Sequence, residues 1–130
     1  MNVVRDVSAL ASCHTVDLFW LNGVTDVAPP GNCHTVTLNE MHCVTDVSAL
    51  ASCAALHTLD LSCCEVTDVS ALAGCAALHT LNLSCCEGVR DVSALAGCAA
   101  LHTLDLPGCS GVTDVSALAG CASLHTLNLW

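Results

Sequence analysis

The sequence predicts an α/β repeat solenoid, in which similar coils stack side by side around one apolar core. The first observation is that two short phrases, Val-x-Asp-Val and His-Thr, recur in step along all 130 residues. The second is that each copy is too short to bury its own apolar side, so neighbouring copies must share a core. The copies of Val-x-Asp-Val begin at Val4, Val24, Val44, Val66, Val89 and Val112, and the His-Thr pairs at His14, His34, His57, His79, His102 and His125.

Each copy contains one short strand. In the third copy Leu56, Leu59 and Leu61 follow the spacing L-x-x-L-x-L, and the last two leucines alternate with a polar residue. A period of two is typical of a strand with one buried face. We therefore expect buried side chains at Leu59, Leu61, Leu81, Leu83, Leu104 and Leu106, together with Cys64, Cys86 and Cys109.

The segment V-T-D-V-S-A-L, residues 66–72, follows the strand and predicts a turn and a return path. Asp68 or Ser70 can cap a short helical turn that carries Ala71 and Leu72. An aspartate in such a turn accepts hydrogen bonds from nearby backbone N–H groups, so we expect a structural role for this column of carboxylates. Its members are Asp6, Asp26, Asp46, Asp68, Asp91 and Asp114.

We expect a single domain over residues 1–130, built from six units at about 4–23, 24–43, 44–65, 66–88, 89–111 and 112–130. The first two units are shorter, and Pro29-Pro30 forbids a regular helical return in the second. Neither end has a recognisable cap, although Trp130 can act as a crude lid. Uncapped ends expose sheet edges, which favours oligomerisation.

The spacing L-x-x-L-x-L-x-x-C-x-V-x-D-V-x-x-L-x-x-C-x-x of residues 56–77 resembles a leucine-rich repeat. Its length and its V-T-D-V-S-A-L segment are most similar to the internalin-like subclass. Cys64, Cys86 and Cys109 stand where that family usually has Asn, as in the cysteine-containing repeats of F-box proteins. The resemblance implies a right-handed coil array, with a short parallel sheet on the concave face and short helical or 3-10 turns on the convex side.

Composition excludes several classes of function. The chain has two Arg, no Lys and a formal net charge of −10, so it should repel phosphate backbones. It has one Phe and no Tyr, which leaves little for stacking on bases. No apolar run is long enough to span a membrane, and MNVVRDVSAL lacks the basic and apolar segments of a signal peptide. We expect neither nucleic acid nor membrane as a partner.

Twelve cysteines fit either a disulfide framework or buried free thiols. Without a visible export signal, reduced thiols in a cytoplasmic compartment are the favoured interpretation, since cysteine often serves as a small buried hydrophobe. Cys63-Cys64 and Cys85-Cys86 are adjacent pairs. One member of each should enter the core while the other lies at a coil corner, where we expect it to be inert for lack of nearby positive charge.

The histidine column is the first candidate for chemistry. Stacked coils would place the rings about 4.8 Å apart, and imidazoles beside thiols can hold zinc. However, no C-x-x-C pair and no helical His-x-x-x-His spacing exists, so a structural or solvated column is favoured. Cys13-His14 and Cys33-His34 are poor nucleophile–base pairs, because neighbouring residues of an extended chain point to opposite faces. We predict no enzyme activity, no metal and no cofactor.

The candidate binding residues lie between the strand leucines and point away from the core. We expect them to line the concave face, which solenoids of this kind commonly use for binding. Phe19 and Trp20 fit either a binding anchor or an edge contact of the first coil. The predicted binding residues are Thr58, Asp60, Thr80, Asn82, Thr103, Asp105, Thr126 and Asn128, and Asp17 and Thr37 occupy equivalent places in the first two strands.

The sequence thus favours a non-enzymatic scaffold that binds a neutral or basic protein through its concave face. Two alternatives stay open. One is a metal- or thiol-binding protein that uses the His and Cys columns. The other is a partial repeat array without independent function, which the near identity of the last four units would suit.

Overall fold

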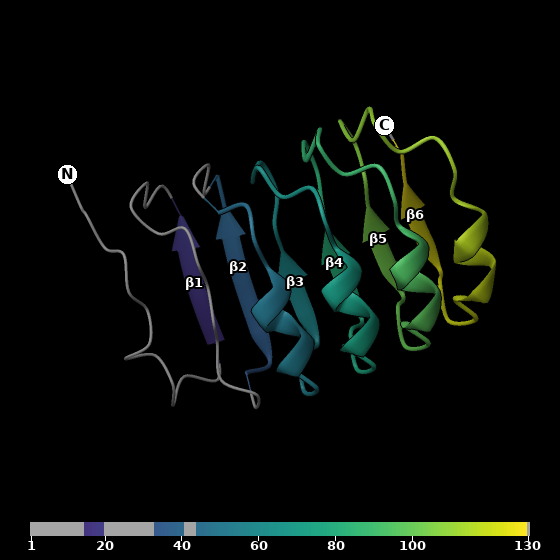
Figure 1. The fold of residues 1–130 in the computed structure, drawn as a ribbon. Helices are drawn as coiled ribbons and strands as arrows, with labels where there is room; N and C mark the ends of the chain where they lie inside the picture. The colour runs from purple at the N-terminus through teal and green to yellow at the C-terminus, as the bar shows by residue number, and fades with distance from the viewer. Residues whose placement is uncertain (1–14, 20–32, 41–43, 130) are drawn as a thin grey trace.

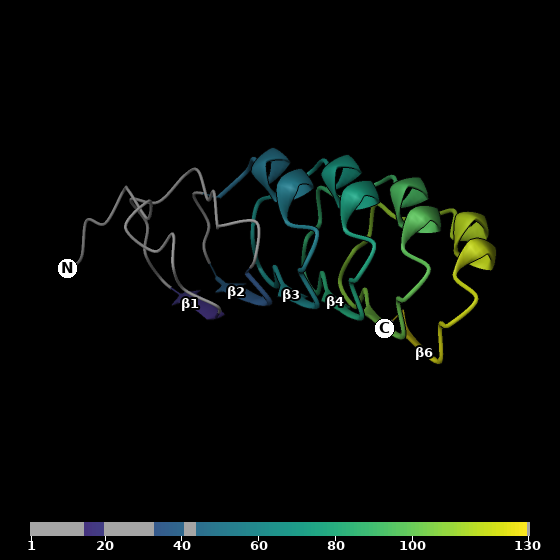
Figure 2. The same ribbon diagram turned by 90° about the horizontal axis from the view of Figure 1, so that it is seen from below.

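The computed structural model describes residues 15–19, 33–40 and 44–129. Six strands form one parallel sheet in chain order (Figure 1). They are β1 (Thr15–Phe19), β2 (Thr35–Asn39), β3 (Thr58–Asp60), β4 (Thr80–Asn82), β5 (Thr103–Asp105) and β6 (Thr126–Asn128). The described return segments form the 3-10 helices η2 (Ser48–Ser52), η3 (Ser70–Gly74), η4 (Ser93–Gly97) and η5 (Ser116–Gly120). Figure 2 shows the strands along one side of the array and the 3-10 helices along the other.

The strands pair in register, so that each residue lies beside its own copy in the next coil. Thr58 pairs with Thr80 and Thr80 with Thr103, and the flanking positions follow the same register. At the start of β2, β3, β4 and β5 one histidine carbonyl accepts two hydrogen bonds from the next coil. The His34 oxygen, for example, accepts the N–H groups of His57 at 2.8 Å and Thr58 at 3.1 Å. This pairing fixes the spacing of the coils.

The core lies between the sheet and the 3-10 helices and is aliphatic. All six leucines and all three cysteines that the sequence predicts to be buried are buried. Strands β3, β4 and β5 share one burial pattern, in which only the central leucine is inaccessible. In β6, at the edge of the sheet, Leu127 is 38% exposed. Burial of the strand leucines therefore depends on the coil that follows.

The return path is a 3-10 helix, and an aspartate orders its start. Asp68 Oδ1 accepts the Ser70 N–H at 2.9 Å, and Asp46, Asp91 and Asp114 repeat this bond in their own coils. The residue directly before each helix, such as Val69, makes no side-chain capping bond. Of the two capping residues that the sequence allows, the aspartate is the one that acts. The predicted structural role of these four carboxylates is confirmed.

Two ladders of thiols cross the core. Cys64, Cys86 and Cys109 each donate to a carbonyl of the preceding coil, with Sγ–O distances of 2.7, 3.0 and 2.8 Å. A second ladder runs below the 3-10 helices and consists of Cys75, Cys98 and Cys121, whose Sγ atoms lie 3.1–3.3 Å from the carbonyl oxygens of Leu50, Leu72 and Leu95. The first ladder was expected from the sequence, and the second was not. Burial raises the pKa of Cys86 to about 12 and that of Cys98 to about 11, so these thiols stay protonated.

The corner after each strand adopts the left-handed conformation. Glu40, Cys63, Cys85 and Gly108 occupy this position in four successive coils, with φ values of 57°, 59°, 62° and 79°. Only glycine adopts such a φ without steric strain. The corners are nevertheless held, because backbone bonds such as Cys63 N–H to Ser84 O at 2.8 Å tie each one to the next coil.

Several predictions lie outside the described residues. These concern Trp20, Pro29-Pro30 and Trp130, and the histidine and thiol of the Cys13-His14 pair. The backbone of Phe19 belongs to β1, but its side chain is not among those described.

Leu81→Ala should lower the free energy of unfolding by about 2–5 kcal/mol, because it leaves a cavity in a fully buried layer. Leu127→Ala, at the paired position in the exposed edge strand, is the matched control and should cost much less. Urea unfolding followed by circular dichroism measures both. Equal losses would contradict the described packing.

Gly108→Ala should destabilise the protein by more than about 1 kcal/mol, since alanine is strained at positive φ. The added Cβ would also lie 3.1 Å from the Cα of Cys85. The control is Gly120→Ala, where the nearest atom is 3.5 Å away. That change should be neutral or stabilise by up to about 1 kcal/mol through the unfolded state. Both values come from the same urea unfolding experiment.

Candidate functional site

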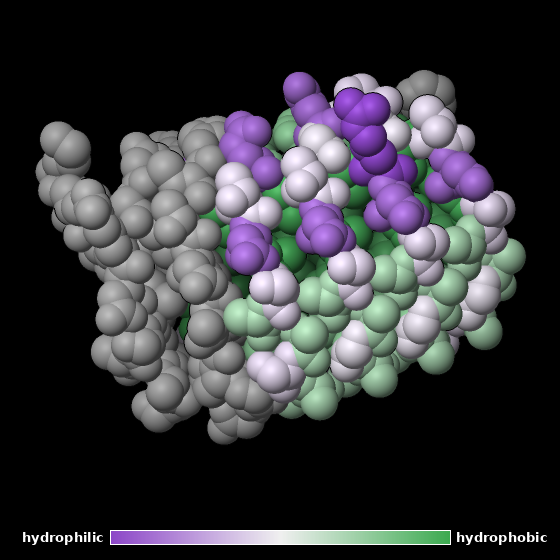
Figure 3. Space-filling view, in the orientation of Figure 1, coloured by the Kyte–Doolittle hydropathy of each residue, from purple (hydrophilic) through white to green (hydrophobic). Residues whose placement is uncertain are grey.

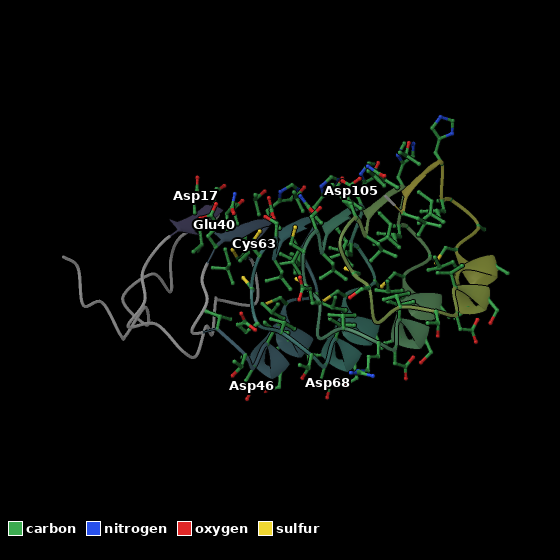
Figure 4. The ribbon with its side chains drawn as sticks, turned by 90° about the horizontal axis from the view of Figure 1, so that it is seen from above. Asp17, Glu40, Asp46, Cys63, Asp68 and Asp105 are labelled. Atoms are coloured by element: carbon green, nitrogen blue, oxygen red, sulfur yellow. The ribbon has the colours of Figure 1, made fainter. Side chains whose placement is uncertain are left out.

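The exposed side of the sheet is a polar surface built from parallel rows, which we call the strand face. One row is threonine and the next is aspartate, asparagine or threonine, both interleaved with the buried leucines. The eight predicted binding residues all lie on it, at the first and third positions of β3 to β6. They are half-buried in β3, β4 and β5 and exposed in β6. In Figure 4, Asp17 and Asp105 lie along this side of the molecule.

Carboxylates alternate with neutral residues along the strand face. The third positions pair in the order Asp17, Thr37, Asp60, Asn82 and Asp105. Successive carboxylates are therefore two strands apart, or about 9.6 Å at the usual strand spacing. This is close to the Debye length of about 10 Å at 0.1 M salt, so their mutual repulsion is weak.

In this row, Asp60 and Asn82 each accept a hydrogen bond from the backbone N–H two residues later. Asp60 Oδ1 accepts the Ser62 N–H at 2.9 Å, and Asn82 Oδ1 accepts the Ser84 N–H at the same distance. This bond lies where the strand ends and the left-handed corner begins. The charge of Asp60 is therefore not needed for this backbone bond.

Stacked imidazoles form a row at the start of the strands. The ring centroids of His34, His57, His79 and His102 are 4.7–4.8 Å apart and the planes nearly parallel, which confirms the expected spacing. His125 is tilted by 31° from His102. In the four stacked residues Nδ1 lies 3.0–3.1 Å from the hydroxyl of the following threonine. One ring nitrogen of each is thus engaged within the chain.

The inner position of His57 lowers its pKa. Desolvation is the largest cause, followed by the charges of His34 and His79 on either side. A proton on one ring therefore opposes a proton on its neighbours. The cationic form of His57 is therefore disfavoured in the stack.

The opposite side of the molecule also carries aspartates, but they are committed to the turns. Figure 3 shows a row of hydrophilic side chains crossing the coils there, and Figure 4 places Asp46 and Asp68 on this side. The Ser70 N–H and hydroxyl lower the pKa of Asp68. Pockets of about 240–400 Å³ lie between these turns, lined mainly by Asp and Ser, with Arg90 in two of them. These carboxylates accept backbone hydrogen bonds in their own turns, and the pockets recur between successive coils. We therefore do not regard them as a distinct site.

The described residues contain no group of three or more His, Cys, Asp or Glu side chains arranged to hold a metal ion. Cys33 is fully buried, and His34 Nδ1 contacts the Thr35 hydroxyl.

Within residues 15–19, 33–40 and 44–129, no helix is long and apolar enough to cross a membrane.

The sequence analysis placed one thiol of each adjacent pair at a coil corner and expected it to be inert, but it did not predict that two corner thiols would lie next to each other. Cys63 and Cys85 sit side by side at the left-handed corners, and together with Glu65 and Glu87 they line a pocket of about 250 Å³. The signal was present, since Gly108 occupies the same place in the next coil and glycine marks positive φ.

The histidine row should make stability depend on pH. His57 has its pKa lowered from an ordinary value of 6.5, so the folded state binds its proton less well than the unfolded state. His57 costs no folding stability well above pH 6.5. Stability falls as the pH drops from 6.5 towards the folded pKa of His57, and the loss is complete below that pKa. His57→Gln should reduce this loss.

The measurement is the urea midpoint between pH 8 and pH 5, with NMR titration of the imidazole protons. His125→Gln, at the tilted and exposed end of the row, is the control and should change the slope less. Identical slopes for both variants and the wild type would contradict coupling within the stack.

Comparison with known proteins agrees with this geometry. The family model for leucine-rich repeats matches residues 54–97. No curated protein sequence matches the chain. Among solved structures, internalin C2 of Listeria monocytogenes is 25% identical with a TM-score of 0.71, over 96% of this chain and 56% of its own. The internalin InlF of the same organism is 20% identical with a TM-score of 0.67, over 97% of this chain and 44% of its own.

A leucine-rich-repeat protein of Leptospira interrogans is 12% identical with a TM-score of 0.55, over 99% of this chain and 47% of its own. The chain thus spans about half the length of the solved structures that it matches. The parallel sheet, the 3-10 returns and the repeat signature all point to one fold family. Residues 54–97 therefore match the leucine-rich-repeat family, and the chain has a leucine-rich-repeat solenoid fold similar to that of the internalins, with cysteine at the position where the repeat usually has asparagine.

Proposed function

We propose that this protein is a non-enzymatic scaffold that binds another protein through its strand face. Leucine-rich-repeat proteins are typically interaction scaffolds, and the strands of this one present a continuous polar surface across β1 to β6. The observation that carries the proposal is the carboxylate row. Asn82 makes the backbone bond of Asp60 without a charge, and Asp105 cannot make that bond because residue 107 is a proline without an N–H. This backbone bond therefore requires the charge of neither aspartate.

The charge pattern defines the class of partner. Asp17, Asp60 and Asp105 line the third positions of the strands, and Glu65 and Glu87 follow at the corners. A partner with basic or neutral groups would be attracted to this edge of the strand face, and an acidic one repelled. We place the protein in a reducing, cytoplasmic compartment. This is supported by the ten described cysteines, which form no disulfide among themselves and eight of which are buried.

Replacing both Asp60 and Asp105 by Asn should weaken partner capture several-fold at low salt, because it removes two negative charges and keeps the backbone bond at residue 60. The difference should shrink towards 1 M salt, where the Debye length is about 3 Å. The assay is affinity capture from the source's own extract, with quantitative mass spectrometry of each captured protein.

A charge-matched control separates the strand face from net charge. Ala73→Lys with Ala96→Lys changes the net charge by the same +2, but at exposed positions of η3 and η4. This variant should retain the partners that the Asn variant loses. Equal losses in both variants would reject the strand face as the binding surface.

A photo-crosslinking residue gives an independent test. Placed at Thr80 in the middle of the strand face, it should join covalently to the captured partner. Placed at Ala96 on η4, it should not. Crosslinks from Ala96 alone, or no captured protein at all, would overturn the proposal and favour a partial array without independent function.

A further inference from the structure

Two cysteines differ from all the others that the structure describes. Eight of the ten described thiols are buried, whereas Cys63 is half-buried and Cys85 is exposed. Both occupy the left-handed corner after a strand, in consecutive coils. The corner before them carries Glu40 and the corner after them Gly108, so the column contains one thiol pair and no longer run among the described coils. In Figure 4, Cys63 and Glu40 lie close together on the strand side.

The two thiols are in contact. Neighbouring coils are about 4.8 Å apart, which falls within the Cα separation of about 4.4–6.8 Å found in disulfides. Cys63 and Cys85 line the same 250 Å³ surface pocket. The pKa of Cys63 is raised, first by burial and then by a hydrogen bond with the Cys85 side chain.

The surroundings of the pair are acidic. Glu65 and Glu87 line the pocket, and the charges of Glu40 and Asp60 help to raise the pKa of Cys63. No arginine is among the residues lining this pocket. The nearby carboxylates lower the fraction of Cys63 that is thiolate, and they also select among reagents, since they attract cations and repel anions.

We propose that Cys63 and Cys85 form a reactive dithiol that closes to a disulfide by exchange with neutral or cationic small-molecule disulfides. The exposed Cys85 is the attacking residue, and Cys63 resolves the mixed disulfide. The site lies at the edge of the strand face and is separate from both buried thiol ladders.

The exchange proceeds in two balanced steps. The Cys85 thiolate attacks one sulfur of the reagent disulfide, forms a mixed disulfide and releases one reagent thiolate. The Cys63 thiolate then attacks Cys85 sulfur, forms the Cys63–Cys85 bond and releases the second reagent thiolate. The two protons of the cysteine thiols pass to the released thiolates. The protein loses two electrons and two protons, and the reagent disulfide becomes two thiols.

The test uses three disulfides of similar size on the full chain under native conditions. These are cystamine, which is cationic, 2-hydroxyethyl disulfide, which is neutral, and dithiodipropionate, which is anionic. Intact mass should show the loss of two hydrogens without an adduct, and peptide mapping should assign the bond to Cys63 and Cys85. Cystamine should react about tenfold faster than the anion at low salt, and the ratio should fall towards one at 1 M salt.

Variants separate the two roles. Cys63→Ser should trap the reagent on Cys85, whereas Cys85→Ser should react slowly at Cys63. Replacing both Glu65 and Glu87 by Gln should bring the cation-to-anion rate ratio towards one without moving the bond. Circular dichroism checks that each variant folds, and the wild-type peptide map decides the question even where one does not.

Three results would overturn the proposal. The first is a stable adduct on wild-type Cys85 that never closes. The second is reaction of the buried thiols at the same rate as the pair. The third is an anionic reagent that reacts as fast as the cationic one at low salt.

Discussion

Each strand of this protein lies about 4.8 Å from a copy of itself, and this in-register stacking determines what every side chain meets. Leucines that lie beside leucines bury apolar surface against each other. Thiols and carbonyls recur at equivalent positions of successive coils and form ladders. A charge, by contrast, would meet an equal charge. The row at the third strand positions avoids this, because Thr37 and Asn82 separate the carboxylates of Asp17, Asp60 and Asp105.

The same stacking explains how cysteine can replace asparagine inside the array. A buried carbonyl needs a donor, and leaving it unpaired would cost about 1–3 kcal/mol. The thiol of Cys86 supplies a weak donor to Leu61 O while adding apolar volume to the core. Burial keeps that thiol protonated, with its pKa at about 12, so a donor is always present. A residue that is reactive elsewhere is here an inert part of the core.

Polar residues divide between the two sides according to what the backbone requires. On the helix side Asp68 and its equivalents hold the start of each 3-10 turn, and their charge is a by-product of that task. On the strand face Asn82 shows that the same type of bond needs no charge. The carboxylates of Asp60 and Asp105 are therefore the more informative ones for recognition. At the corners the fixed left-handed backbone brings Cys63 and Cys85 together without any contribution from the core.

The sequence alone determined the repeat, the positions of the strands, the buried leucines and the first thiol ladder, because each follows from a period that stacking must satisfy. It also placed the eight candidate binding residues between those leucines. The tertiary structure decided that the return is a 3-10 helix and that Asp68 rather than Ser70 orders it. It also decided that Cys75 and its equivalents form a second ladder and that Cys63 contacts Cys85. These features depend on distances between coils and on positive φ at the corner, which no spacing within a single repeat contains.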